Sequence, residues 1–227
     1  MKKEILLVIV LFTVNFTNAQ IHEIGIFAGG SNFMGDVGST TYINPNETAF
    51  GILYKWNKSP RHSWRISYTQ SNITGQDIKS DSQLRINRKY AFTNNIREGS
   101  IGMEFNFMDF NLHESGTKIT PYIYSGVSIF GYSQLFWVNG KFKEDTRNYG
   151  FALPMTVGVK SRITEHWILG AEIGVRYTFT DDIDGSNPKN KNLETLKFGN
   201  LNSNDWFVFT GVTLTYTFGR KPCYCNY

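Results

Sequence analysis

The chain has 227 residues, enough for one domain or one small barrel, and a formal net charge of +4. Its basic residues are scattered along the sequence, which argues against a nucleic-acid partner. Aromatic residues make up 15% of the chain, yet its mean hydropathy is slightly negative. This combination fits a membrane barrel, in which lipid-facing residues alternate with polar ones and form no long apolar run.

Residues 1–19 have the pattern of a secretory signal peptide. Two lysines near the start are followed by the apolar run Ile5–Phe12 and by the small-residue cleavage site Thr17–Ala19. We therefore expect Gln20 to begin the mature protein. An N-terminal membrane helix is the alternative, but the apolar run is too short to span a bilayer.

Eight later segments alternate apolar and polar residues with the period of two that a β-strand imposes. The clearest lies at 166–179, where Ile173 belongs to an apolar set and Glu172 to a small or polar set. One face of such a strand suits lipid and the other suits a polar interior. The eight expected strands lie at about 22–30, 48–56, 63–70, 98–109, 119–132, 151–162, 166–179 and 206–218.

Two of these strands need comment. The last strand has aromatic residues at both ends of its outward set, as a lipid-facing strand between two headgroup layers should. That outward set is Trp206, Val208, Thr210, Val212, Leu214, Tyr216 and Phe218. Its inward set starts with Phe207 and Phe209 and then becomes small and polar. In the sixth strand, Pro154 lacks a backbone donor, so we expect a bulge or a later strand start there.

The connections between the expected strands alternate in length. The short ones lie at 57–62, 110–118 and 163–165, and the long ones at 31–47, 71–97, 133–150 and 180–205. This alternation is typical of outer-membrane barrels, with short periplasmic turns and long extracellular loops. The sequence thus predicts an all-β fold, an eight-stranded antiparallel transmembrane β-barrel of outer-membrane type spanning residues 20–219. It would be integral to the cell outer membrane, with both termini and a short tail at 220–227 in the periplasm.

A soluble sandwich or lipocalin-like barrel is the alternative fold, but it would turn its apolar set inward. The predicted inner face instead carries charges in mid-strand. These residues are Lys55, Arg65, Glu104, Lys160, Glu172 and Arg176. Charges enclosed in a barrel of eight strands need partners, so a salt-bridged plug is the favoured interpretation. An ion path or a buried acid–base pair is the alternative.

An enzymatic role is not expected. Some small outer-membrane barrels hydrolyse or transfer lipid acyl chains, which requires a histidine beside a serine near the outer leaflet. The histidines here are His22, His62, His113 and His166, and all four map to the short-turn side. No cofactor, metal or small-molecule substrate is predicted.

The glycine-rich stretch Gly29–Gly38 superficially resembles a phosphate-binding loop. A true phosphate loop needs a lysine and a following helix, and neither is indicated here. We expect instead a strand that turns at the barrel rim, with glycines at positive φ.

The cysteines Cys223 and Cys225 are two residues apart in the tail, so a bond between them would be strained. Intermolecular pairing and free thiols both remain open, whereas a Cys-x-Cys pair with only distant histidines is weak evidence for a metal site.

The opening Glu23–Asp36, with its glycines, aromatic position and final Gly-Asp, resembles the start of the PorG-like family. These proteins are outer-membrane barrels of the type IX secretion system of Bacteroidetes, an apparatus that also supports gliding motility in some relatives. The resemblance implies a non-enzymatic barrel associated with a periplasmic ring made of a lipoprotein and its partner. It supplies no catalytic residues.

The ring would be contacted through the short turns at 57–62, 110–118 and 163–165 and through the tail at 219–227. The individual contact residues expected are His62, His113, Arg220, Lys221, Cys223 and Cys225. Outer-membrane lipid is the other expected partner. The alternative function is a general stability or adhesion barrel that acts through its outer loops, with Phe136, Trp137 and Lys143 in the stretch at 135–149 as candidate binding residues.

Overall fold

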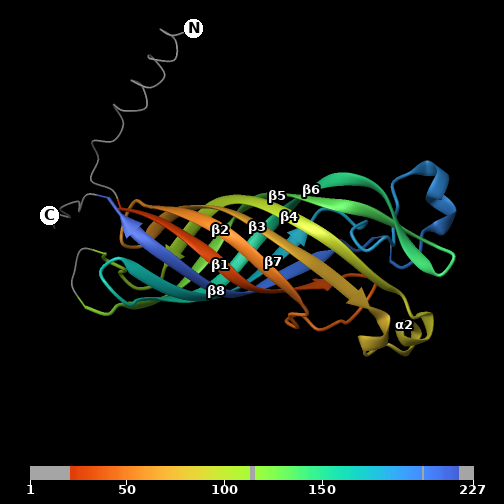
Figure 1. Ribbon diagram of the computed structural model, residues 1–227, viewed down its shortest axis with the longest axis horizontal. Helices are drawn as coiled ribbons and strands as arrows, with labels where there is room; N and C mark the ends of the chain where they lie inside the picture. The colour runs from red at the N-terminus through yellow and green to blue at the C-terminus, as the bar shows by residue number, and fades with distance from the viewer. Residues whose placement is uncertain (1–20, 113–115, 201, 220–227) are drawn as a thin grey trace, which may run out of the picture.

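The computed structural model describes residues 21–112, 116–200 and 202–219 and contains one closed barrel of eight antiparallel strands (Figure 1). Each strand pairs with its neighbours in sequence, and β1 closes the barrel against β8. The strands are β1 (Ile21–Met34), β2 (Glu47–Asn57), β3 (His62–Gln76), β4 (Ala91–Asn106), β5 (Ile119–Val138), β6 (Lys141–Arg162), β7 (Trp167–Thr178) and β8 (Trp206–Phe218). The all-β, eight-stranded antiparallel barrel predicted from the sequence is confirmed.

The strands are strongly staggered around the barrel. A circuit of paired residues that leaves β1 at Ile21 returns to it at Ser31, ten residues farther along. Stagger of this kind tilts the strands and leaves an interior that side chains alone can fill. The closing seam is tight, because a Cβ at Gly29 would lie 2.2 Å from the carbonyl oxygen of Thr210. Glycine is therefore required there for β1 and β8 to meet.

The inner and outer faces differ as the alternation predicts. Ile52 and Val157 on the outside are 62% and 59% exposed, whereas the inward Leu53 is buried. An apolar exterior around a charged interior is the arrangement of an outer-membrane barrel and the reverse of a lipocalin-like one.

In β8 one expectation is wrong: Val208, placed in the lipid-facing set, is buried. Phe207 and Phe209 are also buried, and they pack in an aromatic layer across the lumen.

Several strands continue beyond their predicted ends. β4 begins at Ala91 rather than 98, and β6 begins at Lys141 rather than 151. Above the apolar belt the sheet faces water on its outer side, so the apolar–polar alternation fades while the backbone pairing continues.

The predicted loop at 133–150 is mostly a hairpin that turns at Asn139 and Gly140, which have φ of 50° and 79°. Both residues at positive φ indicate a type I′ turn, for which Asn-Gly is the preferred pair.

The bulge or late start expected at Pro154 is absent. β6 runs through this residue, and its register against β5 is the same on both sides. The pairing of β5 with β6 is interrupted at Gly126 and Val127, opposite Pro154 and its neighbour. The missing N–H of the proline therefore removes local pairing, but β6 contains no extra residue and so no bulge. The register shift between these strands lies elsewhere, between Ser133 and Leu135.

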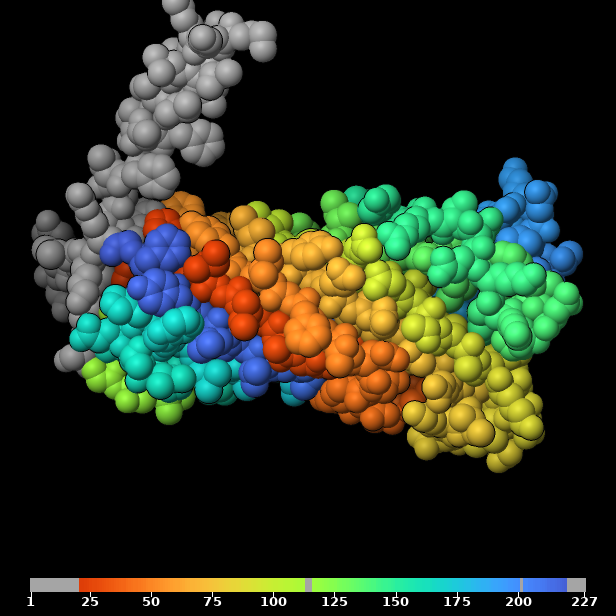
Figure 2. Space-filling view, viewed as in Figure 1, coloured from red at the N-terminus to blue at the C-terminus, as the bar shows by residue number. Residues whose placement is uncertain are grey.

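The two ends of the barrel are unlike. At one, which we call the short-turn end, β1 begins and β8 ends, and the chain passes from β2 to β3, from β4 to β5 and from β6 to β7 (Figure 1). At the other, the loop end, the long connections hold the helical turns η2 (Asp77–Lys79) and η3 (Lys191–Leu196) and the helix α2 (Gln83–Arg88). Figure 2 shows the segments around α2 and η3 projecting from opposite sides of the loop end.

Candidate functional site

The centre of the lumen is built around Glu104 of β4. Lys160 of β6 donates to its Oε1 at 2.6 Å, and Lys55 of β2 donates to the same oxygen at 3.0 Å. All three side chains are almost completely buried. A carboxylate bound by two ammonium groups from different strands ties three parts of the wall together. Such a cluster is stable only while it stays complete, because each charge has lost its water.

A second ion pair lies beside the first. Arg65 of β3 and Glu172 of β7 form a two-pronged pair, with nitrogen–oxygen distances of 2.7 and 2.8 Å. Tyr122 donates to Glu172 at 2.6 Å, so this carboxylate accepts three hydrogen bonds. The guanidinium of Arg65 also lies 3.9 Å from Glu104, which links the two clusters. Parallel donor–acceptor pairs of this kind fix geometry as well as charge.

Towards the loop end the lumen continues with a third pair. Arg176 of β7 approaches Glu98 of β4 at 3.2 Å, and its guanidinium carbon lies 4.6 Å from the ring centre of Phe209. Beyond it, buried rings close the interior, among them Phe27, Phe130, Phe207 and Phe209. Charge pairs and rings thus fill the barrel along its axis, which favours the plug over an open ion path.

The structure places all six predicted lumen residues inside the barrel, but not in one network. Five of them form the two linked clusters, and Arg176 pairs separately. Two buried acids escaped the sequence reasoning. They are Glu98, which pairs with Arg176, and Glu23, which accepts from Asn57 and Thr215. Both stand at positions that the alternation of their strands assigns to the interior, so the sequence pattern could have identified them.

The glycine-rich stretch after β1 does bind anions, but these anions are the chain's own carboxylates. The backbone N–H groups of Asp36 and Val37 donate to Asp184 at 2.9 and 3.1 Å, and that of Gly38 donates to Asp77 at 2.9 Å. Of the glycines expected at positive φ, only Gly38 has this conformation, at 103°. Successive N–H groups converging on a carboxylate are a common anion cradle. Here the cradle fastens the first loop to two later ones.

Further buried carboxyl groups lie in the same loop assembly. Burial and the nearby charges of Asp184 and Asp36 raise the pKa of Asp181 to about 7. Burial also raises the pKa values of Asp184 and Asp205. In an unfolded chain these groups titrate near pH 4, so folding of the loop end takes up protons. The loop assembly therefore loses stability as the pH rises from about 4 through 7.

We expect Asp181→Asn to weaken this pH dependence. At pH 8 the variant avoids a buried charge and should stabilise the loop assembly by roughly 1–2 kcal/mol, whereas at pH 4 it should have little effect. Limited proteolysis of the loop end at both pH values measures the difference. Asp145→Asn, at an exposed position in the same end, serves as the control. Equal cleavage of Asp181→Asn and the unmodified protein at pH 8 would contradict this expectation.

The short-turn end carries the histidines that the structure describes. His22 stacks between Tyr54 and Phe218, His62 lies against Phe105, and His166 lies against Tyr216. These contacts place the three rings at the barrel's aromatic border, at the end opposite the long loops. His62 is exposed, and its contact with a partner stays a prediction. The other predicted contact residues, His113, Arg220, Lys221, Cys223 and Cys225, lie outside the described residues.

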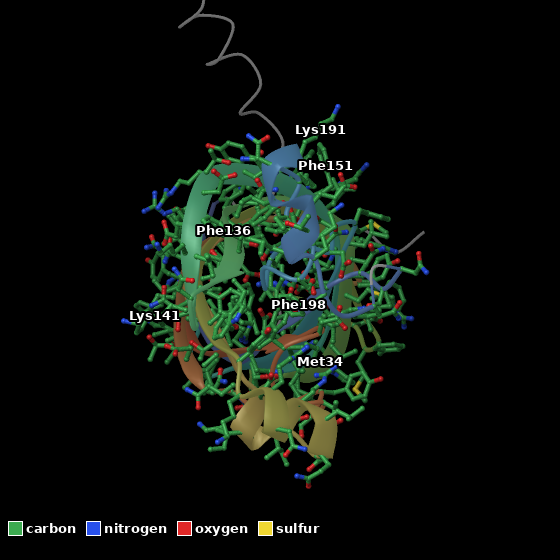
Figure 3. The ribbon with its side chains drawn as sticks, turned by 90° about the vertical axis from the view of Figure 1, so that its right-hand side faces the viewer. Met34, Phe136, Lys141, Phe151, Lys191 and Phe198 are labelled. Carbon is green, nitrogen blue, oxygen red and sulfur yellow. The ribbon has the colours of Figure 1, made fainter. Side chains whose placement is uncertain are left out.

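Of the candidate binding residues Phe136, Trp137 and Lys143, Trp137 is engaged within the molecule, whereas Lys143 is exposed. Trp137 lies 4.0 Å from Tyr90 and 4.8 Å from Phe142, ring centre to ring centre, and Phe198 joins the same group. Figure 3, which looks at the loop end, shows Phe198 within the mouth and Lys141 at its edge, pointing away. This aromatic cluster therefore holds the loops together, while lysines form its rim.

Within the described ranges, no group of three or more His, Cys, Asp or Glu residues is arranged to hold a metal ion. No helix in the same ranges is long and apolar enough to cross a membrane. The predicted leader at 1–19 lies outside them.

Comparison with solved structures finds other small barrels at low identity. The attachment invasion locus protein Ail of Yersinia pestis, in complex with the heparin analogue sucrose octasulfate, is 11% identical over 88% of this chain and 100% of that one, with a TM-score of 0.49. The N-terminal barrel domain of OprF of Pseudomonas aeruginosa is 13% identical over 86% and 97%, with a TM-score of 0.45. Neisserial surface protein A is 11% identical over 88% and 96%, also with a TM-score of 0.45.

No curated protein matches the chain. One family model, described as a domain of unknown function, DUF6089, matches residues 2–227. Because the match spans almost the whole sequence, this chain is a member of the DUF6089 family.

Proposed function

We propose that this protein is a non-enzymatic outer-membrane barrel that anchors or helps assemble the periplasmic ring of a type IX secretion system. The filled lumen carries the proposal, because a barrel plugged by ion pairs and rings is a poor pore but a rigid anchor. The likeness of Glu23–Asp36 to the PorG-like opening suggests which apparatus it serves. In this proposal the short-turn end faces the periplasm and the loop end faces outward.

The surface of the short-turn end supports a docking role. Met108 and Ile163 are 57% and 56% exposed in two different turns. Nearby, Arg61 and Asp109 form an exposed ion pair at 2.6 Å. Apolar side chains beside charged ones are typical of a protein contact surface. The ring lipoprotein and its partner would meet these turns, and the tail with Arg220, Lys221, Cys223 and Cys225 would complete the contact.

The test is capture of ring proteins from detergent-solubilised outer membranes by the tagged barrel, with and without reductant. We expect the unmodified barrel to recover the ring lipoprotein, and Met108→Asp combined with Ile163→Asp to recover clearly less. Leu84→Asp is the matched control, because Leu84 is an exposed apolar residue of α2 at the opposite end. Recovery that is absent from the unmodified barrel, or unchanged in the double variant, would refute ring docking at the turns.

Non-reducing gels test the tail separately. If Cys223 or Cys225 bonds to a ring protein, the unmodified barrel migrates in a larger complex that disappears when both cysteines are changed to serine. Identical mobility of the two would exclude covalent attachment and leave the turn contacts as the means of docking.

An adhesion or stability barrel acting through the loop end is the alternative. Exposed apolar side chains at that end, such as Tyr42, Ile78 and Leu84, favour it. In that case the Leu84→Asp variant would lose surface binding while the short-turn variants would keep both binding and secretion.

A further inference from the structure

An unusual stretch of the outer wall lies where the apolar belt ends towards the loop end. One row of paired, outward residues there consists of Tyr68, Gly99, Ile129 and Phe151 on β3 to β6. The next row, two residues nearer the loop end, consists of Gln70, Arg97, Gly131 and Tyr149. In these two rows β3 and β6 carry the rings of Tyr68, Phe151 and Tyr149, whereas β4 and β5 carry two glycines, Arg97 and Ile129.

The surroundings of Arg97 leave its charge available. Its side chain is exposed, and it makes no hydrogen bond or ion pair with any residue of the described ranges. The space over Gly99 is open, because a Cβ built there meets nothing within 4 Å. On the other side, a Cβ at Gly131 would lie 3.3 Å from the ring of Tyr149, so this ring leans across β5 towards Arg97. The glycines therefore leave open space on the outer wall beside Arg97.

A second arginine extends this feature. Arg147 pairs with Ser133 on the next step of β6 and is likewise exposed, without an ion-pair partner in the described part of the chain. The short-turn end provides a contrast, because its exposed Arg61 is neutralised by Asp109. Two guanidinium groups without an ion-pair partner in the described residues thus lie beyond the outward row of Ile129 and Phe151, on the side of the loop end. Guanidinium groups are well suited to phosphate, which they bind through paired hydrogen bonds.

We propose that Arg97 and Arg147 bind the phosphate of a phosphorylated glycolipid in the outer leaflet, with its acyl chains lying against Ile129 and Phe151. The apolar row directly below the arginines explains why the ligand is a lipid rather than a free anion, since a soluble phosphate could not use it. This inference rests on the outer-membrane location and on the outward-facing loop end of the proposed function, but not on ring docking, so lipid binding and ring docking can fail independently.

Native mass spectrometry of the barrel in detergent with diphosphorylated lipid A as the probe tests this site. We expect one retained lipid A, and retention weakened about tenfold or more when Arg97→Ala and Arg147→Ala are combined. Arg61→Ala is the matched control and should retain lipid A normally. Dephosphorylated lipid A should bind as weakly to the unmodified barrel as lipid A does to the double variant, and millimolar inorganic phosphate should not displace lipid A.

Two outcomes would overturn the proposal. Equal retention of both forms of lipid A would mean that the apolar belt alone holds the lipid. Equal retention by the double variant and the unmodified barrel would mean that phosphate binds elsewhere. Because both arginines lie on the outer wall and pair with no acidic residue in the ranges that the structure describes, the double variant should keep its melting temperature, and this measurement separates lost binding from lost folding.

Discussion

Replacing Glu104 with leucine is expected to lower the melting temperature of the detergent-solubilised barrel more than any other single change in the lumen. The substitution leaves the buried ammonium groups of Lys55 and Lys160 without their shared acceptor. Breaking a buried ion pair by removing one partner costs about 3–5 kcal/mol. The temperature at which the folded band disappears on semi-native gels, together with circular dichroism, measures the loss.

The matched variant removes the whole cluster rather than one member. Combining Glu104→Leu with Lys55→Met and Lys160→Leu should recover much of the lost stability, because apolar residues of similar size often replace a buried ionic triad without loss. Planar-bilayer recordings should show no new conductance in Glu104→Leu or in Glu172→Leu, since buried rings still fill the lumen. A large pore in either variant, or unchanged melting of Glu104→Leu, would contradict the structural plug.

The lumen could be predicted because a barrel imposes one simple rule on every strand. Each residue faces either lipid or the interior, so the parity of Glu104 and Glu172 sufficed to place them. The same rule applied to Glu23 and Glu98, which were overlooked because they stand near predicted strand ends. The alternation alone cannot predict which inward charges form an ion pair. Arg176 pairs with Glu98 rather than Glu172 because strand stagger, set by the closed barrel, decides which side chains share a level.

The loop end could not be derived in the same way. Its main fastening joins Asp184 to the backbone of Asp36 and Val37, which lie 148 and 147 residues away in the sequence. No local sequence pattern predicts this contact, because it forms only when closure of the barrel places the end of β1 next to the connection that precedes β8. The Asn139–Gly140 hairpin is different, since that dipeptide is itself a strong turn signal and was passed over within a polar stretch.

Arginine placed on the lipid-facing wall at mid-depth is expected to impair insertion severely. Val212 is 50% exposed on the outside of β8, and its cross-strand neighbours are Ala28 and Ala171. At the bilayer midplane, Val212→Arg should destabilise the inserted barrel by about 2–4 kcal/mol, and Ile173→Arg on β7 should behave similarly. Folding from urea into phospholipid vesicles, followed by the gel shift of the folded band, measures the effect.

Thr48→Arg provides the matched control, because it adds the same charge to the outer wall at the exposed start of β2, where Thr48 pairs with Gly30. Near the membrane interface such a change should cost only about 0–1 kcal/mol. A strong effect at Val212 with a weak one at Thr48 means that the charge is penalised by depth in lipid rather than by any disturbance of the sheet. If both variants insert like the unmodified chain, the apolar wall does not face acyl chains, and the anchoring role and the lipid site lose their common basis.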